Sequence, residues 1–421
     1  MTTSLQRQAL YPPLIQVGPS PNLGIVVVIP CYDEDFLLLS LLALKRCERP
    51  RCDVEVIVVI NDGEDAAASV KAKNKHTFEQ AKRWALSNAL PHLGFHIVYK
   101  PGLPKKHAGV GLARKIGMDE ACFRFAKAGR PNGIIVCFDA DSSCEATYFK
   151  ALENHFEKNL DAQACSIYFE HPLDGIDHDA AVYEAITLYE LHLRYYVQAQ
   201  RWAGIPHAFQ TIGSSMAVRC NAYQQQGGMN KRKAGEDFYF LQKFIPLGRF
   251  SEITDTKVIP SPRPSHRVPF GTGRAVEGLL QSKKDCLTYH PNSFKDLQVF
   301  LKTKLYGEQR PGEILAGLPD SIRAFLESQD FEKNIEEIQA NTSSRLAFQK
   351  RFYRWYDAFM VMKFVHFARD NFYGDIEVKE AARWLLSAYG PVSQHEANNL
   401  DGRQLLGWFR TKRGLCNKVN W

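Results

Sequence analysis

Residues 24–30, Gly-Ile-Val-Val-Val-Ile-Pro, are the sequence feature that most limits the possible folds. An unbroken β-branched run ended by proline is typical of a strand that is buried on both faces. Similar apolar runs lie at residues 54–60, 95–99 and 134–138, and helix-like stretches at 36–47, 66–90 and 110–126 separate them. This alternation predicts an α/β fold with a mainly parallel, Rossmann-like sheet flanked by helices.

The second part of the chain has a different pattern. We expect strands at residues 164–170 and 213–219, a long tyrosine-rich helix at 178–203 and another helix near residue 237. From about residue 275 onward the sequence predicts mostly helices. The predicted organisation is an N-terminal arm (1–23), an α/β domain (24–275) and a mostly helical C-terminal region (276–421).

Composition limits the classes of function. With 45% hydrophobic and 24% charged residues, the 421-residue chain is typical of a globular protein with one large domain and a smaller one. The net charge of +7 is spread along the sequence, which favours anionic ligands such as nucleotide phosphates or an anionic membrane surface. Nucleic acid is not an expected partner, because binding it usually requires a concentrated basic patch.

The sequence features that bear on cellular location favour the cytoplasm. The ten cysteines are scattered without the C-x-x-C pairs of a zinc site, and their pattern favours a reducing compartment. The N-terminus lacks the apolar core of a signal peptide. No stretch approaches the ~20 apolar residues that a membrane-spanning helix needs, while peripheral association stays open.

Asp139-Ala-Asp141 follows the strand expected at 134–138. Two carboxylates at the end of a buried strand can hold a hard cation such as Mg²⁺ or Mn²⁺, which in turn binds a diphosphate. The alternative is a turn or a helix N-cap. The segment 177–179 has the same spacing and is predicted to cap a helix, and 33–35 is a further acidic cluster. Position at a strand end favours Asp139 and Asp141 as the functional pair.

Two other segments are candidates for donor binding. Asp62, in Asn61-Asp-Gly63, can accept hydrogen bonds from a base or a ribose, although a simple tight turn is the alternative. Residues 109–117, Gly-Val-Gly-Leu-Ala-Arg-Lys-Ile-Gly, predict a closely packed helix that offers Arg114 to a phosphate. They are not a dinucleotide fingerprint, because no G-x-G-x-x-G follows the first strand, and this counts against a nicotinamide enzyme.

Two further segments carry candidate chemistry. Gly235-Glu236-Asp237 starts a predicted helix, where a carboxylate is either stabilised by the helix dipole or serves as a general base. Residues 265–274 form a loop rich in His, Arg and Gly, including His266 and Arg267. This loop offers a metal ligand or phosphate contacts, and its alternative is an exposed basic loop.

These segments, in this order, resemble the family 2 glycosyltransferases with a GT-A fold over residues 24–275. The matching segments are Val-Ile-Pro-Cys-Tyr-Asp-Glu (28–34), Val-Ile-Asn-Asp-Gly (59–63), Gly-Leu-Ala-Arg-Lys-Ile-Gly (111–117), Phe-Asp-Ala-Asp (138–141), Gly-Ser-Ser-Met-Ala-Val-Arg (213–219), Gly-Gly-Met (227–229) and Gly-Glu-Asp (235–237). Residues 276–421 match no pattern of this kind.

The resemblance implies a role for each matching residue. Asp237 is the catalytic base, and Glu236 helps to position it or the acceptor. Asp141, with Asp139 and His266, is expected to bind the metal. Donor binding is expected of Pro30, Tyr32, Glu34, Asp62, Arg114, Asp139, His266 and Arg267. Two positions depart from the family pattern, since Asp33 and Lys115 stand where asparagine is common.

The implied reaction is inverting, metal-dependent transfer of a sugar from a nucleotide-diphosphate donor to an acceptor hydroxyl. A nucleotidyltransferase acting on a sugar phosphate and a non-catalytic nucleotide-sugar binding protein are the alternatives. The sequence leaves the acceptor, the donor sugar and the base open. We expect residues 276–421 to cover one side of the donor site or to receive the acceptor.

Overall fold

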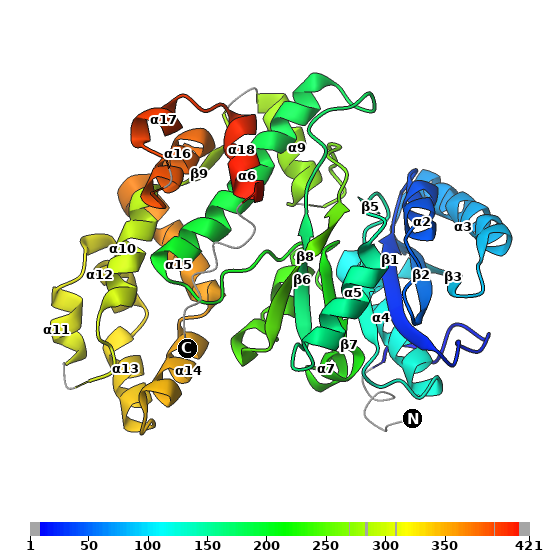
Figure 1. Cartoon of the computed structure of the whole chain (residues 1–421), viewed down its shortest axis with the longest axis horizontal. Coiled ribbons are helices and arrows are strands. Elements are labelled where there is room, and N and C mark those ends of the chain that lie inside the picture. Colours follow the sequence, from blue (N-terminus) through cyan, green and yellow to red (C-terminus); the bar gives the residue numbers. More distant parts are fainter. Residues whose placement is uncertain (1–8, 269, 283–284, 308–309, 391, 412–421) are drawn as a thin grey trace. The chain divides into compact units, whose positions relative to one another are not determined.

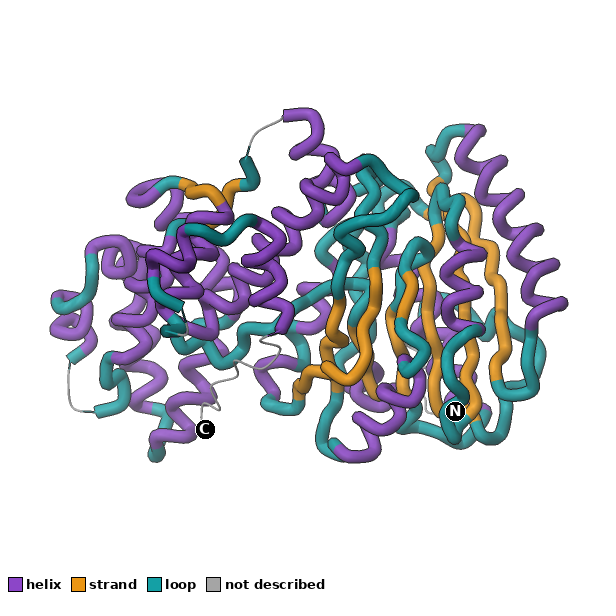
Figure 2. The backbone as a smooth tube through the Cα atoms, turned by 45° about the horizontal axis from the view of Figure 1, so that its top comes forward, coloured by secondary structure: helices purple, strands orange, loops and turns teal. Residues whose placement is uncertain are grey.

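The computed structural model describes residues 9–268, 270–282, 285–307, 310–390 and 392–411. The chain folds into two compact units (Figure 1). The first contains residues up to Pro172, 211–262 and 266–271, and the second contains 173–210, 263–265 and the chain from 272 onward. Strands are gathered in the first unit and helices dominate the second (Figure 2).

The first unit is built on an eight-stranded sheet in the order β3-β2-β1-β4-β7-β6-β8-β5. Its strands are β1 (Leu23–Cys31), β2 (Asp53–Gly63), β3 (Leu93–Leu103), β4 (Ile134–Cys137), β5 (Ser143–Cys144), β6 (Ala164–Phe169), β7 (Met216–Arg219) and β8 (Phe250–Ile259). The pairs β1–β2, β1–β4, β2–β3 and β6–β8 are parallel, whereas β4–β7, β6–β7 and β5–β8 are antiparallel. The predicted α/β fold with a mainly parallel sheet is confirmed.

The register of β1 places three strand ends together. Cys31 lies opposite Ile60 of β2, and Val28 lies opposite Cys137 of β4. Because all three strands run in the same direction, the polar residues that follow them gather at the carboxyl-terminal ends of the strands. Ligands of open α/β sheets bind at these strand ends.

Helices flank this sheet. They are α2 (Leu37–Lys45), α3 (Ala68–Asn88), α4 (Val110–Lys127), α5 (Tyr148–Lys158), α7 (Cys220–Gln225) and α8 (Glu236–Leu241), with a 3₁₀ turn at Ile245–Leu247. Gly117 lets α4 pack closely on β1 and β2, since an added Cβ would lie 3.2 Å from Val59 Cγ2 and closer still to Val28. The close packing predicted from residues 109–117 is therefore present.

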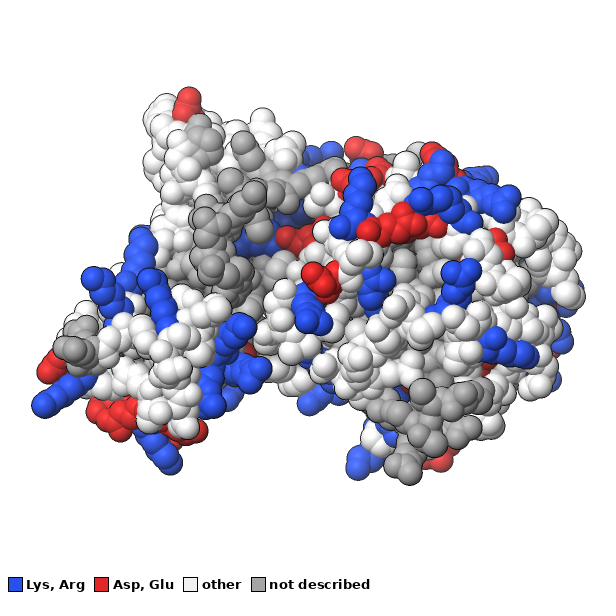
Figure 3. All heavy atoms as spheres, turned by 60° about the horizontal axis from the view of Figure 1, so that its bottom comes forward, with Lys and Arg blue, Asp and Glu red and all other residues white. Residues whose placement is uncertain are grey.

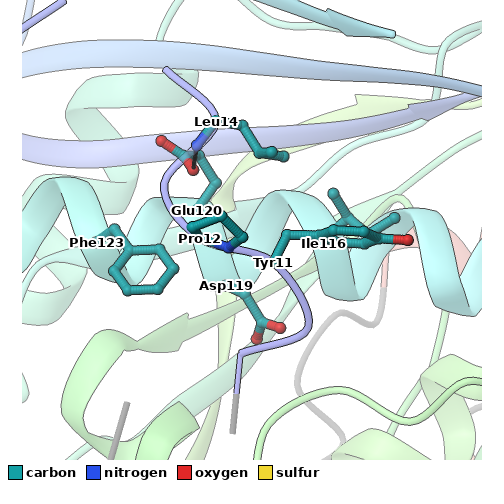
Figure 4. Close-up of a pocket in the computed structure, with 7 residues that line it drawn as sticks. All are labelled: Tyr11, Pro12, Leu14, Ile116, Asp119, Glu120 and Phe123. Carbon is teal, nitrogen blue, oxygen red and sulfur yellow. Dashed lines mark hydrogen bonds between the residues drawn. The ribbon is translucent and has the colours of Figure 1, made fainter. Parts of the chain in front are cut away.

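The N-terminal arm packs along α4. Glu120 accepts hydrogen bonds from the backbone amides of Leu14 (2.7 Å) and Ile15 (3.2 Å), and the Arg124 guanidinium donates to the Val17 carbonyl (2.9 Å). A small pocket between the arm and α4 is lined by Tyr11, Pro12, Leu14, Ile116, Asp119, Glu120 and Phe123 (Figure 4). The arm thus supplies the hydrogen-bond partners of a buried carboxylate.

The second unit is mostly helical, as predicted for the C-terminal region. Its elements are α6 (Ala180–Ala203), α9 (Thr272–Ser282), β9 (Leu287–Tyr289), α10 (Pro291–Lys302), α11 (Pro311–Ala316), α12 (Asp320–Ser328), α13 (Phe331–Ala340), α14 (Arg345–Trp355), α15 (Ala358–Ala368), a π turn (Arg369–Tyr373), β10 (Asp375–Glu377), α16 (Val378–Ala388), α17 (Gln394–Asn398) and α18 (Gly402–Thr411). Strands β9 and β10 form an antiparallel pair.

Helix α6 belongs to this second unit, which differs from the single boundary expected near residue 275. Its buried residues Leu191, Tyr195 and Ala199 share one apolar core with the C-terminal helices. Buried Glu190 is also paired with Arg410 of α18 at 2.6 Å. The units are therefore discontinuous in the sequence.

Three smaller predictions, on a helix cap, the cysteines and membrane spans, can be compared with the structure. Asp179 occupies the N-cap position of α6 as predicted, but its side chain accepts no capping hydrogen bond. The nine cysteines that the structure describes are free thiols. Among the described residues, no helix combines the length and the apolar character needed to cross a membrane.

Candidate active site

The end of β1 is held by a buried carboxylate. Glu34 is only 2% exposed, and its Oε1 accepts hydrogen bonds from the amides of the two following residues, both at 2.9 Å. Its Oε2 pairs with Arg267 Nη1 at 2.9 Å. Arg267 also donates to the Tyr32 carbonyl (2.9 Å), and its Nη2 lies 3.7 Å from Asp141 Oδ2. The guanidinium of Arg267 therefore joins the end of β1 to the segment after β4.

Asp62, at the end of β2, is fully buried. Its Oδ1 accepts a hydrogen bond from the Gly102 amide at 2.9 Å, whereas its Oδ2 has no hydrogen-bond partner in the described part of the chain. Tyr32 is 37% exposed, and its pKa is raised by burial first and then by the charges of Asp33 and Asp62. Asp62 Oδ2 is therefore a buried acceptor whose hydrogen-bonding capacity is unused by the residues that the structure describes.

Asp141 follows β4 but does not cap a helix. The residues after it form β5, and α5 begins at Tyr148 with Thr147 in the N-cap position. The N-cap alternative for Asp141 is therefore wrong. The side chains of Asp139 and Asp141 are 37% and 22% exposed, so both carboxylates are accessible to a ligand.

Arg114, in the first turns of α4, connects two of the predicted carboxylates. Its side chain is 2% exposed and forms ion pairs with Asp139 through Nη2 and with Glu236 through Nη1. Burial lowers the pKa of Arg114, but the charges of Asp139 and Glu236 outweigh this and raise it overall, so the guanidinium stays charged. Because both carboxylates already bind it, Arg114 is placed to position them.

Gly213 makes room for this guanidinium. An added Cβ at position 213 would lie 2.9 Å from Arg114 Cζ and closer to its two Nη atoms. Optimal carbon–carbon contacts are about 3.5–4.0 Å, so a larger side chain would force Arg114 to move. The glycine of the Gly213-Ser-Ser segment is therefore required by a close approach.

Glu236 and Asp237 open the short helix α8, as the sequence predicts. Glu236 is 3% exposed, and burial raises its pKa to about 7, opposed by Arg114 and supported by the charge of Asp237. Asp237 is half-buried, and its Oδ1 accepts a hydrogen bond from the Phe238 amide at 2.7 Å. Burial also raises the pKa of Asp237, and Arg114 opposes that shift. Of the two residues, Asp237 is the less buried as a whole.

The remaining predicted residues, Pro30 and His266, differ in their position and burial. Pro30 lies within β1, opposite Val59 of β2, and is half-buried. His266 is exposed. Among the described residues, no three or more His, Cys, Asp or Glu side chains form a group that could hold a metal ion, and so Asp139, Asp141 and His266 do not form one.

Asn74 of α3 is a residue of the site that the sequence did not indicate. It is fully buried, its Oδ1 accepts from the Asp33 amide (2.9 Å), and its Nδ2 donates to the Asn61 carbonyl (3.0 Å). Asp33 has a positive φ of 51°, which is unusual for a residue other than glycine. Asn74 thus ties the end of β1 to the end of β2. No local signal predicts this, because its partners are distant in the sequence.

Neither a family model nor a curated protein sequence matches the chain. Among solved structures, residues 1–349 of S. aureus TarS in complex with UDP-GlcNAc are 14% identical, with a TM-score of 0.39 over 75% of this chain and 91% of that chain. A second crystal structure of S. aureus TarS residues 1–349 is 11% identical, with a TM-score of 0.36 over 93% of each chain. Because these identities and TM-scores are low, a function for this chain has to be argued from its own residues.

Proposed function

We propose that this chain is a glycosyltransferase that moves a sugar from a nucleotide-diphosphate donor to an acceptor hydroxyl, with inversion at the anomeric carbon. The observation that carries the proposal is the buried Arg114, whose two ion pairs join Asp139 at a strand end to Glu236 beside the candidate base. Support also comes from the order of the sequence motifs, which resembles that of family 2 glycosyltransferases.

The nucleoside is assigned to the end of β2. The partnerless Oδ2 of Asp62 would accept a hydrogen bond from the base or the ribose, and the exposed ring of Tyr32 would contact the base. The diphosphate is assigned to the carboxyl-terminal ends of β1 and β4, where Arg267 lies between Glu34 and Asp141. A guanidinium at this place supplies a positive charge and a planar set of donors.

The donor atoms at the end of β4 fit a hard divalent cation. Mg²⁺ is usually bound by one or two carboxylates together with substrate phosphates and water. Asp141 and Asp139 would supply the carboxylates, whereas His266, the third ligand expected from the sequence, forms no metal-holding group with them among the described residues. A bound Mg²⁺ or Mn²⁺ would offset the negative charge that develops on the leaving diphosphate.

Asp237 would accept the proton of the acceptor hydroxyl as that oxygen attacks the anomeric carbon. The bond from the anomeric carbon to the diphosphate breaks, and the nucleoside diphosphate leaves. A pKa raised by burial makes Asp237 a stronger base than an ordinary aspartate. Glu236, held by Arg114, would fix the start of α8 and hence the position of Asp237.

The test combines binding with hydrolysis. A panel of nucleotide sugars is screened by thermal shift with and without Mn²⁺, and the stabilising donor is then hydrolysed by wild type, with water as acceptor. Release of nucleoside diphosphate supports sugar transfer. Release of pyrophosphate from a nucleoside triphosphate and a sugar phosphate would instead indicate a nucleotidyltransferase, and binding without turnover a binding protein.

Asp237→Asn keeps the size of the side chain but removes the proton acceptor. Because general-base catalysis contributes about 10²–10⁴-fold, hydrolysis should fall by that order while donor affinity stays near normal. Asp161→Asn, at an exposed position, is the control and should keep full activity. If Asp237→Asn keeps more than about a tenth of the wild-type rate, the base lies elsewhere and Glu236 is the next candidate.

A further inference from the structure

Lys231, Arg232 and Lys233 are three consecutive basic residues, separated by Ala234 from Gly235 and the carboxylate pair, and we call them the basic loop. All three side chains are exposed. Asn230 fixes the loop at its start, since its Nδ2 donates to the Glu236 carbonyl (2.8 Å) and its Oδ1 accepts from the Arg232 amide (3.0 Å).

The start of α4 also holds the basic loop. An added Cβ on Gly109 would lie 3.0 Å from Lys233 Cα, and one on Gly111 would lie 3.1 Å from the Arg232 amide nitrogen. Such contacts are tighter than side chains accept, so these two glycines permit the loop backbone to lie against the helix. The backbone positions of Arg232 and Lys233 relative to the carboxylate pair are therefore set by packing against the start of α4.

The charges of the basic loop are not neutralised by neighbouring acids. In the part of the chain that the structure describes, no carboxylate lies within ion-pair distance of any of the three side chains. The Arg232 guanidinium instead lies over the ring of Tyr239, 3.5 Å from its centroid, which orients it. By contrast, Lys73 and Lys105, near the strand ends, are paired with Asp33 (3.0 Å) and Asp65 (3.3 Å).

Position, rather than charge alone, distinguishes the basic loop. Lys and Arg side chains occur at many separate places on the face shown in Figure 3, so an exposed cation by itself selects no site. The basic loop is the segment leading into Glu236 and Asp237, where the acceptor hydroxyl is assigned. The donor diphosphate is assigned elsewhere, to the strand ends beside Arg267.

We propose that the basic loop binds a phosphate or carboxylate group of the acceptor, so that the acceptor is an anionic molecule. This inference rests on the proposed function and extends it to the class of the second substrate. These three cations, which precede the base closely in the sequence, would hold the anionic group while the acceptor hydroxyl faces Asp237. They would also raise the local concentration of an anionic acceptor.

The test uses tripolyphosphate as a probe of the acceptor side, with the donor site saturated by the nucleoside diphosphate found in the thermal-shift panel. Binding is measured by calorimetry in wild type and in the variant K231Q/R232Q/K233Q. We expect the variant to bind tripolyphosphate about tenfold more weakly or worse, and the wild-type affinity to fall as salt is added. Lys158→Gln, at an exposed position on α5, is the matched control and should bind as wild type.

Two results would overturn the inference. Equal tripolyphosphate affinity in wild type and the triple variant would mean that the loop holds no anion. A loss of nucleoside diphosphate affinity or of donor hydrolysis in the triple variant would assign the loop to the donor. Failure of wild type to bind any nucleoside diphosphate would contradict the proposed function itself, and this outcome is seen before the probe is added.

Discussion

Gly213→Ala tests whether the close approach at Arg114 controls the site. The added Cβ would lie 2.9 Å from Arg114 Cζ, whereas carbon atoms in contact prefer about 3.5 Å or more. Both Nη atoms would lie closer still, so the guanidinium would have to move by about 1 Å, away from a position in which it pairs with both Asp139 and Glu236. Overpacking in a closed site costs about 1–3 kcal/mol. Complete loss of a buried pair costs about 3–5 kcal/mol and sets the upper limit.

The assay measures the free energy of unfolding by denaturant titration and donor affinity by calorimetry. We expect Gly213→Ala to lose about 1–3 kcal/mol of stability and also to bind the donor more weakly, because Asp139 shifts with Arg114. Gly18→Ala is the matched control, since nothing lies within 4 Å of an added Cβ at Gly18. Wild-type stability together with wild-type donor affinity in Gly213→Ala would refute the reasoning.

Three further predictions concern carboxylates. Asp141→Asn should sharply lower metal-dependent donor affinity, measured by calorimetry with Mn²⁺, while Asp179→Asn should change it little; equal effects would mean that the wrong pair of aspartates was chosen. The pKa of Glu236 is raised from 4.5 to about 7, so the folded chain holds this proton more tightly and stability should fall as pH rises across that window, by up to about 1.4 kcal/mol per pH unit. Glu236→Gln should remove this slope from the unfolding free energies, and an unchanged slope would assign it to another group. Glu120→Gln weakens the acceptor of two backbone amides of the N-terminal arm and should cost about 1–3 kcal/mol in denaturant titration, whereas exposed Glu79→Gln should cost nothing measurable.

The elements around these strand ends could be predicted because their signals are local. The apolar run at 24–30 and the three later runs became β1 to β4, and the helices between them lie close to the expected residues. Strand β8 (Phe250–Ile259) was missed. Its buried residues, such as Ile253, Thr256 and Val258, alternate with polar ones too irregularly to stand out as a strand.

Pairing and unit boundaries depend on contacts that periodicity does not encode. Strand β6 pairs parallel to β8 and antiparallel to β7, although nothing in its own residues specifies either partner. Helix α6 was expected in the first domain, because the sequence predicted a single boundary near residue 275. Its apolar face packs against the C-terminal helices, and the helix therefore belongs to the second unit.

The residue types of the candidate site followed from motifs, but their connections did not. Arg114 was expected to contact a donor phosphate, and the structure buries it between Asp139 and Glu236. Asn74 carried no signal at all, since a single asparagine in a polar helix is ordinary. A motif records which groups are present, whereas the burial and the partners of each group are set by segments far apart in the chain.

Burying Arg114 together with Asp139 and Glu236 can serve either stability or the positioning of the carboxylates. Taking three charged groups out of water is costly, and apolar side chains of similar volume often stabilise a fold as well or better. Net stability is therefore a weak reason for burying Arg114 with Asp139 and Glu236. A fixed distance between the donor-side carboxylate and the start of α8 is a stronger reason, because positioning of catalytic groups is sensitive to shifts of about 1 Å. Gly213→Ala separates the two reasons, since a purely structural role would lower stability and leave donor affinity unchanged.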